Sequence, residues 1–141
     1  MKLAGQTALV NGGGTGIGKA IALALAAEGC HVAVAGRREG PLREVADSFT
    51  GEPKIEVLTA DVGDRESATA LVNKATELLG QIDILVNNAG TNTPKRLLMD
   101  LDPADWDRLM AVNATGAYNC IHGVVPAMVE RGDGLIINIS S

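Results

Sequence analysis

Short apolar runs alternate along the chain with longer segments in which apolar residues recur at helical spacing. The apolar runs predict buried strands at residues 7–10, 31–35, 55–59, 82–86 and 135–139. The helical spacing predicts helices at 16–27, 41–49 and 65–79, and a long helix from Asp102 to about Glu130, in one piece or two. Apolar strands that alternate with helices are typical of a parallel sheet covered on both faces.

Local signals support two of these helices. Asp102, Pro103 and Asp105 together predict a helix start, with a capping aspartate, a proline in the first turn and an acid near the positive end of the helix. The helix at 65–79 has a core-facing stripe and is followed by Gly80, a stop signal.

With right-handed crossovers, this order of elements predicts a doubly wound α/β sheet with strand order 3-2-1-4-5. In such a sheet the ligand crevice lies at the carboxyl ends of the first and fourth strands. The 141 residues are enough for one domain with its own core, and no repeat or linker divides residues 1–141.

Charge and composition narrow the expected partners. The net charge is −5 and there is no basic run, so neither nucleic acid nor an anionic membrane is an expected partner. No apolar run reaches membrane-spanning length and no signal peptide is evident, which favours a cytoplasmic protein. Cys30 and Cys120 lack metal-ligand spacing, so we expect two reduced thiols and no metal site.

The densest cluster of candidate chemistry is the glycine run that follows the first strand. Gly12 permits a tight turn, Gly16 lets backbone approach a pyrophosphate, and Gly18 lets the next helix pack on the strand. Free N–H groups and the helix dipole would then face the anion. Glycines also serve plain turns, but their place between strand and helix favours a dinucleotide. The residues expected to bind it here are Gly12, Gly14, Thr15, Gly16, Ile17 and Gly18.

The end of the second strand bears on the choice of cofactor. An acid there would accept both ribose hydroxyls of NAD, but this chain has Arg37 and Arg38. An arginine can hold a 2′-phosphate by charge-assisted bonds of about 1.5–3 kcal/mol each. We therefore expect NADP, with NAD as the alternative if the two arginines are merely solvated.

Three later segments complete a pattern. They are Asn87-Asn88-Ala89-Gly90, then Asn113, then the strand that ends at Ser140-Ser141. In this order, after the glycine run, they resemble the short-chain dehydrogenase/reductase family over the whole chain. The resemblance implies a Rossmann fold and hydride transfer between a nicotinamide cofactor and a small carbonyl or alcohol substrate, with a 3-oxoacyl thioester as a family-level possibility.

The resemblance also implies roles for single residues. Asp61 would bond the adenine amino group and Val62 would pack on the ring, although an aspartate here could instead cap a helix, a place that suits Asp64 better. Asn113 would break the long helix locally and hold a water of the proton relay, or simply be a satisfied buried amide. Ser141 would hydrogen-bond the substrate carbonyl. The cofactor-lining residues after the fourth strand would be Asn88, Ala89 and Gly90.

The chain departs from the family pattern at three points. Asn11 replaces a threonine, a change we expect to be tolerated because its side chain still bonds. Thr15 occupies a position that many NADP enzymes fill with arginine. The family's Tyr-x-x-x-Lys pair is absent, and Tyr118 cannot replace it because His122 stands where the lysine would be.

We therefore expect the 141 residues to be the N-terminal, cofactor-binding portion of a longer enzyme, lacking the last strands and inactive alone. The full-length form would be a homo-oligomer, a dimer or tetramer. The alternative is a non-catalytic nucleotide-binding fragment or subunit.

Overall fold

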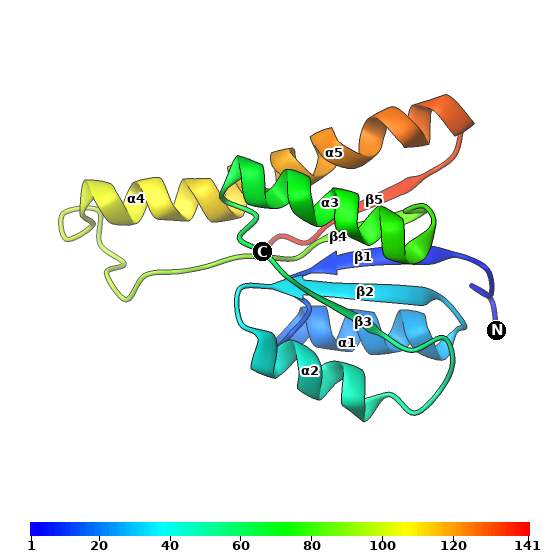
Figure 1. Cartoon of the computed structure of the whole chain (residues 1–141). Coiled ribbons are helices and arrows are strands. Elements are labelled where there is room, and N and C mark those ends of the chain that lie inside the picture. The colour runs from blue at the N-terminus through cyan, green and yellow to red at the C-terminus, as the bar shows by residue number, and fades with distance from the viewer.

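A parallel sheet lies between two layers of helices in the computed structural model, which describes residues 1–141 (Figure 1). Its five strands run in the order β3-β2-β1-β4-β5, which confirms the expected topology. The strands are β1 (Thr7–Asn11), β2 (His31–Gly36), β3 (Glu56–Thr59), β4 (Ile84–Asn87) and β5 (Leu135–Asn138).

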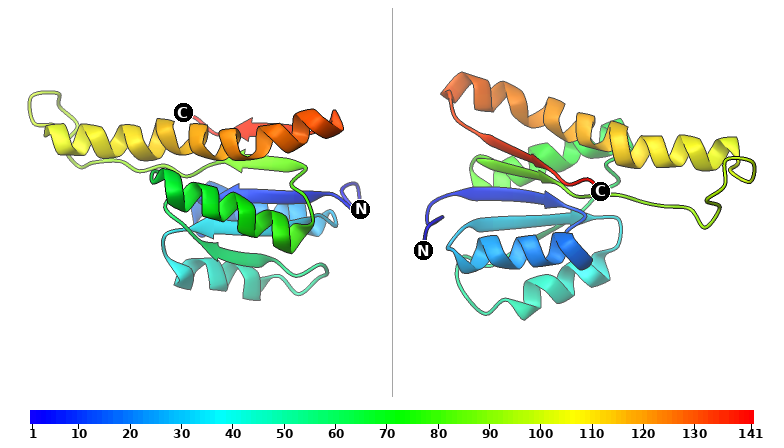
Figure 2. Two further views of the ribbon diagram at one scale, coloured as in Figure 1. Left: turned by 45° about the horizontal axis from the view of Figure 1, so that its top comes forward. Right: turned by 180° about the vertical axis from the view of Figure 1, so that it is seen from behind.

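The helices divide between the two faces of the sheet (Figures 1 and 2). One face carries α1 (Gly16–Ala27) and α2 (Glu39–Ser48). The other carries α3 (Arg65–Leu79) and α5 (Gly116–Arg131), which pack against each other. Each face has its own aliphatic core: Leu42 and Val45 lie in the first, and Leu71 and Val124 in the second.

The long helix is present from Pro103 to Arg131 but is not uniform. It consists of α4 (Pro103–Met110), a π-helical turn η1 (Ala111–Thr115) and α5. The local disturbance expected at Asn113 is therefore a π-helical turn rather than a break. Helix α4 has no buried residue and projects beyond the sheet (Figure 2).

Two sequence expectations need correction here. Asp102 is the residue before α4 but makes no side-chain capping bond, because its carboxylate pairs with Lys95. The fourth strand begins at Ile84 rather than at residue 82, because Asp83 turns its carboxylate to the Thr7 backbone N–H at 2.9 Å.

None of the helices combines the length and the apolar character that crossing a bilayer requires.

Candidate functional site

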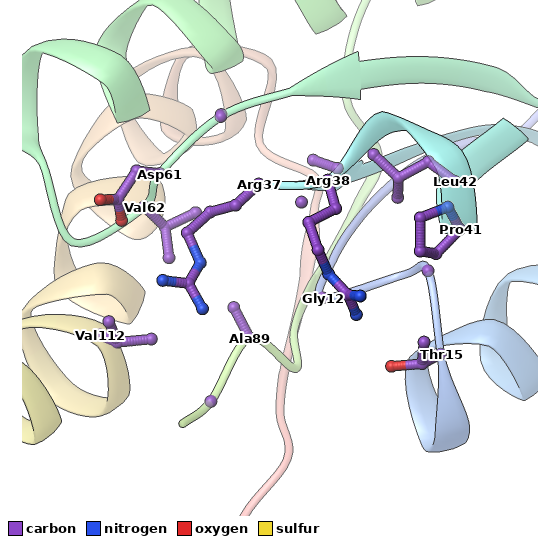
Figure 3. A pocket seen from close by; sticks show the side chains of 15 residues that line it. Gly12, Thr15, Arg37, Arg38, Pro41, Leu42, Asp61, Val62, Ala89 and Val112 are labelled. Carbon is purple, nitrogen blue, oxygen red and sulfur yellow. The ribbon is translucent and has the colours of Figure 1, made fainter. Parts of the chain in front are cut away.

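A pocket of about 140 Å³ lies at the carboxyl ends of β1, β2, β3 and β4 (Figure 3). This is the crevice that the doubly wound topology predicts. Nine of the lining residues are candidates from the sequence: Gly12, Gly14, Thr15, Arg37, Arg38, Asp61, Val62, Ala89 and Gly90.

The glycine turn is built so that two backbone segments touch. Gly12 has φ +65°, and a Cβ there would lie 2.8 Å from the Ala89 backbone nitrogen. At Gly18 a Cβ would lie 2.0 Å from the carbonyl oxygen of Gly12, so α1 packs against the turn with no room for a side chain. Both glycines therefore perform the packing expected of them, and Gly12 brings the turn against the segment that follows β4.

The first turn of α1 is open to an anion. Gly16 has φ +54°, and a Cβ there would meet nothing within 4 Å. Thr15, the residue before the helix, makes no capping bond, and no acid lies in the first turn. In α3, by contrast, Asp64 accepts a bond from the Ser67 N–H at 2.7 Å. Because α1 lacks such a cap, its N–H groups and its positive dipole end remain available to a phosphate.

Asn11 holds in place the segment after β4 that lines the pocket. Its Oδ1 accepts from the backbone N–H groups of Asn88 at 2.8 Å and Ala89 at 2.7 Å, and the residue is 1% exposed. A threonine hydroxyl at this position could not also donate the two amide hydrogens that Asn11 carries. The expectation that Asn11 keeps a bonding role is met, with more bonds than the sequence indicated.

Those amide hydrogens start a chain of bonds across three strands. Asn11 Nδ2 donates to Asn87 Oδ1 at 2.8 Å, and Asn87 Nδ2 donates to Asn138 Oδ1 at 2.9 Å. The three residues are in register on β1, β4 and β5. Asn11 Nδ2 also lies 3.5 Å from Sγ of Cys120. Burial raises the pKa of the Cys120 thiol, and the bond from Asn11 offsets only part of that rise. We call Asn11, Asn87 and Asn138 the amide ladder.

Arg37 and Arg38 carry the positive charge of the pocket. Both are exposed and neither forms an ion pair, since the neighbouring Glu39 pairs with Arg43. In Figure 3 the Arg37 guanidinium points between Val62 and Ala89, and that of Arg38 points toward the turn at Gly12. Two unpaired guanidinium groups suit a phosphate.

Asp61 is the single acid that lines the pocket. Its Oδ1 accepts from the Gly63 N–H at 3.0 Å, so the carboxylate shapes its own turn. Helix α3 is capped by Asp64 instead, as the sequence suggested. Val62 is buried, and its Cγ2 would be 2.7 Å from a Cβ at Gly116.

Several candidates lie outside the pocket lining. Gly16 and Gly18 act through the backbone and the packing described above. Ile17 is 63% exposed. Asn88 turns its Nδ2 to the carbonyl oxygen of Gly12 at 3.0 Å, which braces the turn rather than lining the pocket.

Asn113 and Ser141 also lie outside the pocket lining. Asn113 is exposed in η1, and its amide bonds the backbone of Thr91 twice, at 2.7 and 2.9 Å. The alternative of a satisfied buried amide is therefore wrong in one respect, because the Asn113 amide is satisfied but exposed. Ser141 is exposed and follows β5 at the carboxyl edge of the sheet.

Sequence reasoning missed six lining residues: Ala35, Gly36, Pro41, Leu42, Ala60 and Val112. Ala35 and Gly36 end β2, a signal that could have been read from the position of the strand. Pro41 and Leu42 lie in the first turns of α2, where the sequence shows only a helix start. Cys30 and Cys120 are both buried and unpaired.

The sequence model of the short chain dehydrogenases matches residues 6–141 of this chain. The chain belongs to the short-chain dehydrogenase family. Among curated proteins, it is 37% identical over 142 residues to the 3-oxoacyl-acyl-carrier-protein reductase FabG of Thermotoga maritima and 43% identical over 141 residues to nodulation protein G of Azospirillum brasilense. These matches cover 100% and 96% of this chain, but only 57% and 56% of the two relatives, so the chain spans little more than half of their length.

Solved structures of family members agree with the fold. A metagenomic short-chain oxidoreductase in complex with NADP superposes with a TM-score of 0.94 at 35% identity, covering 100% of this chain and 64% of that one. A putative short-chain alcohol dehydrogenase from Sinorhizobium meliloti gives a TM-score of 0.93 at 38% identity, covering 99% of this chain and 56% of that one.

Proposed function

We propose that this chain is the NADP(H)-binding part of an oxidoreductase that interconverts a carbonyl and an alcohol by hydride transfer. The observation that carries the proposal is the meeting, in one pocket, of the uncapped α1 N-terminus with the unpaired Arg37 and Arg38. The NADP complex of the metagenomic relative supports the choice of cofactor.

Each part of the pocket has its own task in this proposal. The N–H groups of the first turn of α1 bind the pyrophosphate, and the open backbone at Gly16 allows the close approach. Arg37 and Arg38 bind the 2′-phosphate. Asp61 and Val62 receive the adenine. The chemistry that a bound dinucleotide would supply in this pocket is the donation or acceptance of a hydride.

The chemistry at the substrate would involve Asn113 and Ser141. Ser141 would donate a hydrogen bond to the substrate carbonyl, and Asn113 would hold a water for proton transfer while bonding Thr91. The proton itself would come from a Tyr-x-x-x-Lys pair outside these 141 residues. A 3-oxoacyl thioester is the proposed substrate class, because the curated relatives include 3-oxoacyl-acyl-carrier-protein reductases. A cytoplasmic homo-oligomer is the proposed working form.

The test of cofactor choice is calorimetric titration of the protein with NADPH and NADH. We expect NADPH to bind at least about tenfold more tightly, because one charge-assisted bond is worth about 1.5–3 kcal/mol. The double variant Arg37→Ala/Arg38→Ala should weaken NADPH binding to the level of NADH and leave NADH unchanged. Arg43→Ala is the matched control, because Arg43 pairs with Glu39 outside the pocket. Equal binding of both dinucleotides by the unaltered protein would refute the NADP preference.

A second candidate is nucleotide binding without catalysis. Residues 1–141 contain the nucleotide pocket, and the one tyrosine among them, Tyr118, is followed four residues later by His122. Oxidation of NADPH in the presence of 3-oxoacyl thioesters or simple ketones separates the two candidates. Binding without turnover favours the second.

A further inference from the structure

The buried side chain of Asn119 forms one hydrogen bond and leaves its other polar atom without a partner, and neither feature has a part in the proposed function. Asn119 lies on α5 and is 6% exposed. Its Nδ2 donates to the carbonyl oxygen of Val62 at 2.9 Å, and its Oδ1 has no partner. A buried polar atom without a partner is costly, so its presence calls for an explanation.

Helix α5 holds Val62 from two sides. One turn before Asn119, Gly116 lies so close that a Cβ there would be 2.7 Å from Val62 Cγ2. Gly116 therefore leaves the space in which the side chain of Val62 packs, while Asn119 binds the Val62 carbonyl oxygen. The N–H of the following Gly63 donates to the Asp61 carboxylate at 3.0 Å, so a further bond joins the two ends of the turn 61–63.

This turn forms one wall of the pocket. Val62 and Asp61 both line it, at the end toward which Arg37 points (Figure 3). Asn119 itself does not line the pocket, so any effect that it has on a ligand must pass through Val62.

Stability alone does not explain an asparagine here. A leucine of similar shape would remove the unpaired Oδ1 and would leave the Val62 carbonyl unpaired instead. The number of buried acceptors without a partner would stay the same, and the apolar surroundings of α5 would favour leucine. What leucine cannot do is hold the Val62 carbonyl in one orientation.

We infer that Asn119 is a positioning residue that fixes Val62 for the adenine end of the dinucleotide, an inference that rests on the proposed function. The π-helical turn η1, which leads into α5 in the same long helix, carries Asn113, whose amide bonds the Thr91 backbone after β4. One helix thus holds, by amide-to-backbone bonds, the segments that follow β3 and β4.

A double-mutant cycle with NADPH tests this inference. The variants are Asn119→Leu, Val62→Ala and the two combined, with dissociation constants from calorimetry and unfolding midpoints from urea titration. We expect Asn119→Leu to raise the dissociation constant by about three- to tenfold, the equivalent of one hydrogen bond, with little change in the unfolding midpoint. If Asn119 acts through Val62, the combined variant should bind no more weakly than Val62→Ala alone.

Met128→Ala is the control for general loosening of α5. Met128 is buried on the same helix, packs against Gly134 and lies away from the pocket, so this variant should lower stability without weakening NADPH binding. The inference is overturned if Asn119→Leu binds NADPH normally, if the effects of Asn119→Leu and Val62→Ala multiply, or if Met128→Ala weakens binding as much. Failure of the unaltered protein to bind NADPH or NADH would overturn the proposed function and this inference with it.

Discussion

At the scale of single residues, Gly18 has the least room for a side chain. We expect Gly18→Ala to destabilise the protein strongly and to abolish NADPH binding, because its Cβ would fall 2.0 Å from the Gly12 carbonyl oxygen and 2.4 Å from Asn88 Nδ2. Overpacking of this kind typically costs about 1–3 kcal/mol or more. Urea unfolding and calorimetry measure the two effects.

Gly40→Ala is the matched control for Gly18→Ala. A Cβ at Gly40 would meet nothing within 4 Å, and the residue lies in α2, so alanine should be neutral or should stabilise by up to about 1 kcal/mol. If Gly18→Ala proved as benign as Gly40→Ala, the close packing of α1 on the turn would be wrong.

A second single residue, Cys30, gives a prediction about pH. Burial, and to a lesser extent the Asp83 carboxylate, raises the pKa of the Cys30 thiol from 9.0 to about 11. The unfolded chain then loses this proton at lower pH than the folded protein, so the contribution to stability is present below pH 9 and is lost as the pH rises toward 11. Each unit of difference is worth about 1.4 kcal/mol.

Urea unfolding at pH 8 and pH 10.5 measures this loss, with Cys30→Ala as the reference. The unaltered protein should lose more stability between the two pH values than Cys30→Ala does. Equal losses in both proteins would show that Cys30 does not contribute.

At the scale of elements, the amide ladder joins three strands and is centred on Asn11. We expect Asn11→Ala to lower the free energy of unfolding by about 2 kcal/mol or more. It leaves the buried Oδ1 of Asn87 and the partly buried N–H groups of Asn88 and Ala89 unpaired, and a buried group without a partner costs about 1–3 kcal/mol. Urea unfolding gives the value.

Asn92→Ala is the control for Asn11→Ala. Asn92 is also an asparagine with a backbone partner, but it is exposed and accepts one local bond, from the Thr93 N–H at 2.9 Å. Its replacement should change stability by less than about 0.5 kcal/mol. A cost at Asn11 no larger than at Asn92 would contradict the importance of the ladder.

The sequence could predict the elements but not the bonds between them. Hydrophobic spacing indicated the five strands and the helices α1, α2, α3 and α5, because their apolar residues recur with the period of a strand or a helix. Helix α4, which has no buried residue, was indicated instead by the start signals at Asp102 and Pro103. The ladder depends on Asn11, Asn87 and Asn138 falling in register, and strand register is not visible in a single sequence. The π-helical turn is likewise hidden, because one shifted turn leaves the spacing on either side almost unchanged.

At the scale of the whole molecule, the strand order followed from the alternation of elements and the handedness of crossovers. The place of the pocket followed from that order. Its shape did not, because Pro41, Leu42 and Val112 reach it only through the packing of α2 and η1 beside the sheet. The role of Asn119 was equally invisible, since its partner Val62 is distant in sequence and bonds it through a backbone carbonyl.

The outer edge of β5 is the least protected surface of the sheet. This strand pairs only with β4, and the exposed fractions of Leu135, Ile137 and Ile139 are 51%, 37% and 37%. An unpaired apolar strand edge is a template for pairing with another chain.

Expressed as these 141 residues, the protein should therefore self-associate. The variant Ile137→Lys should shift it toward monomer in sedimentation velocity, because charge on an edge strand opposes pairing. Leu78→Lys is the control: Leu78 is 39% exposed on α3, which packs over β1, β2 and β3, so its replacement should leave self-association unchanged. If both lysines were equally effective, general surface charge rather than the β5 edge would govern association.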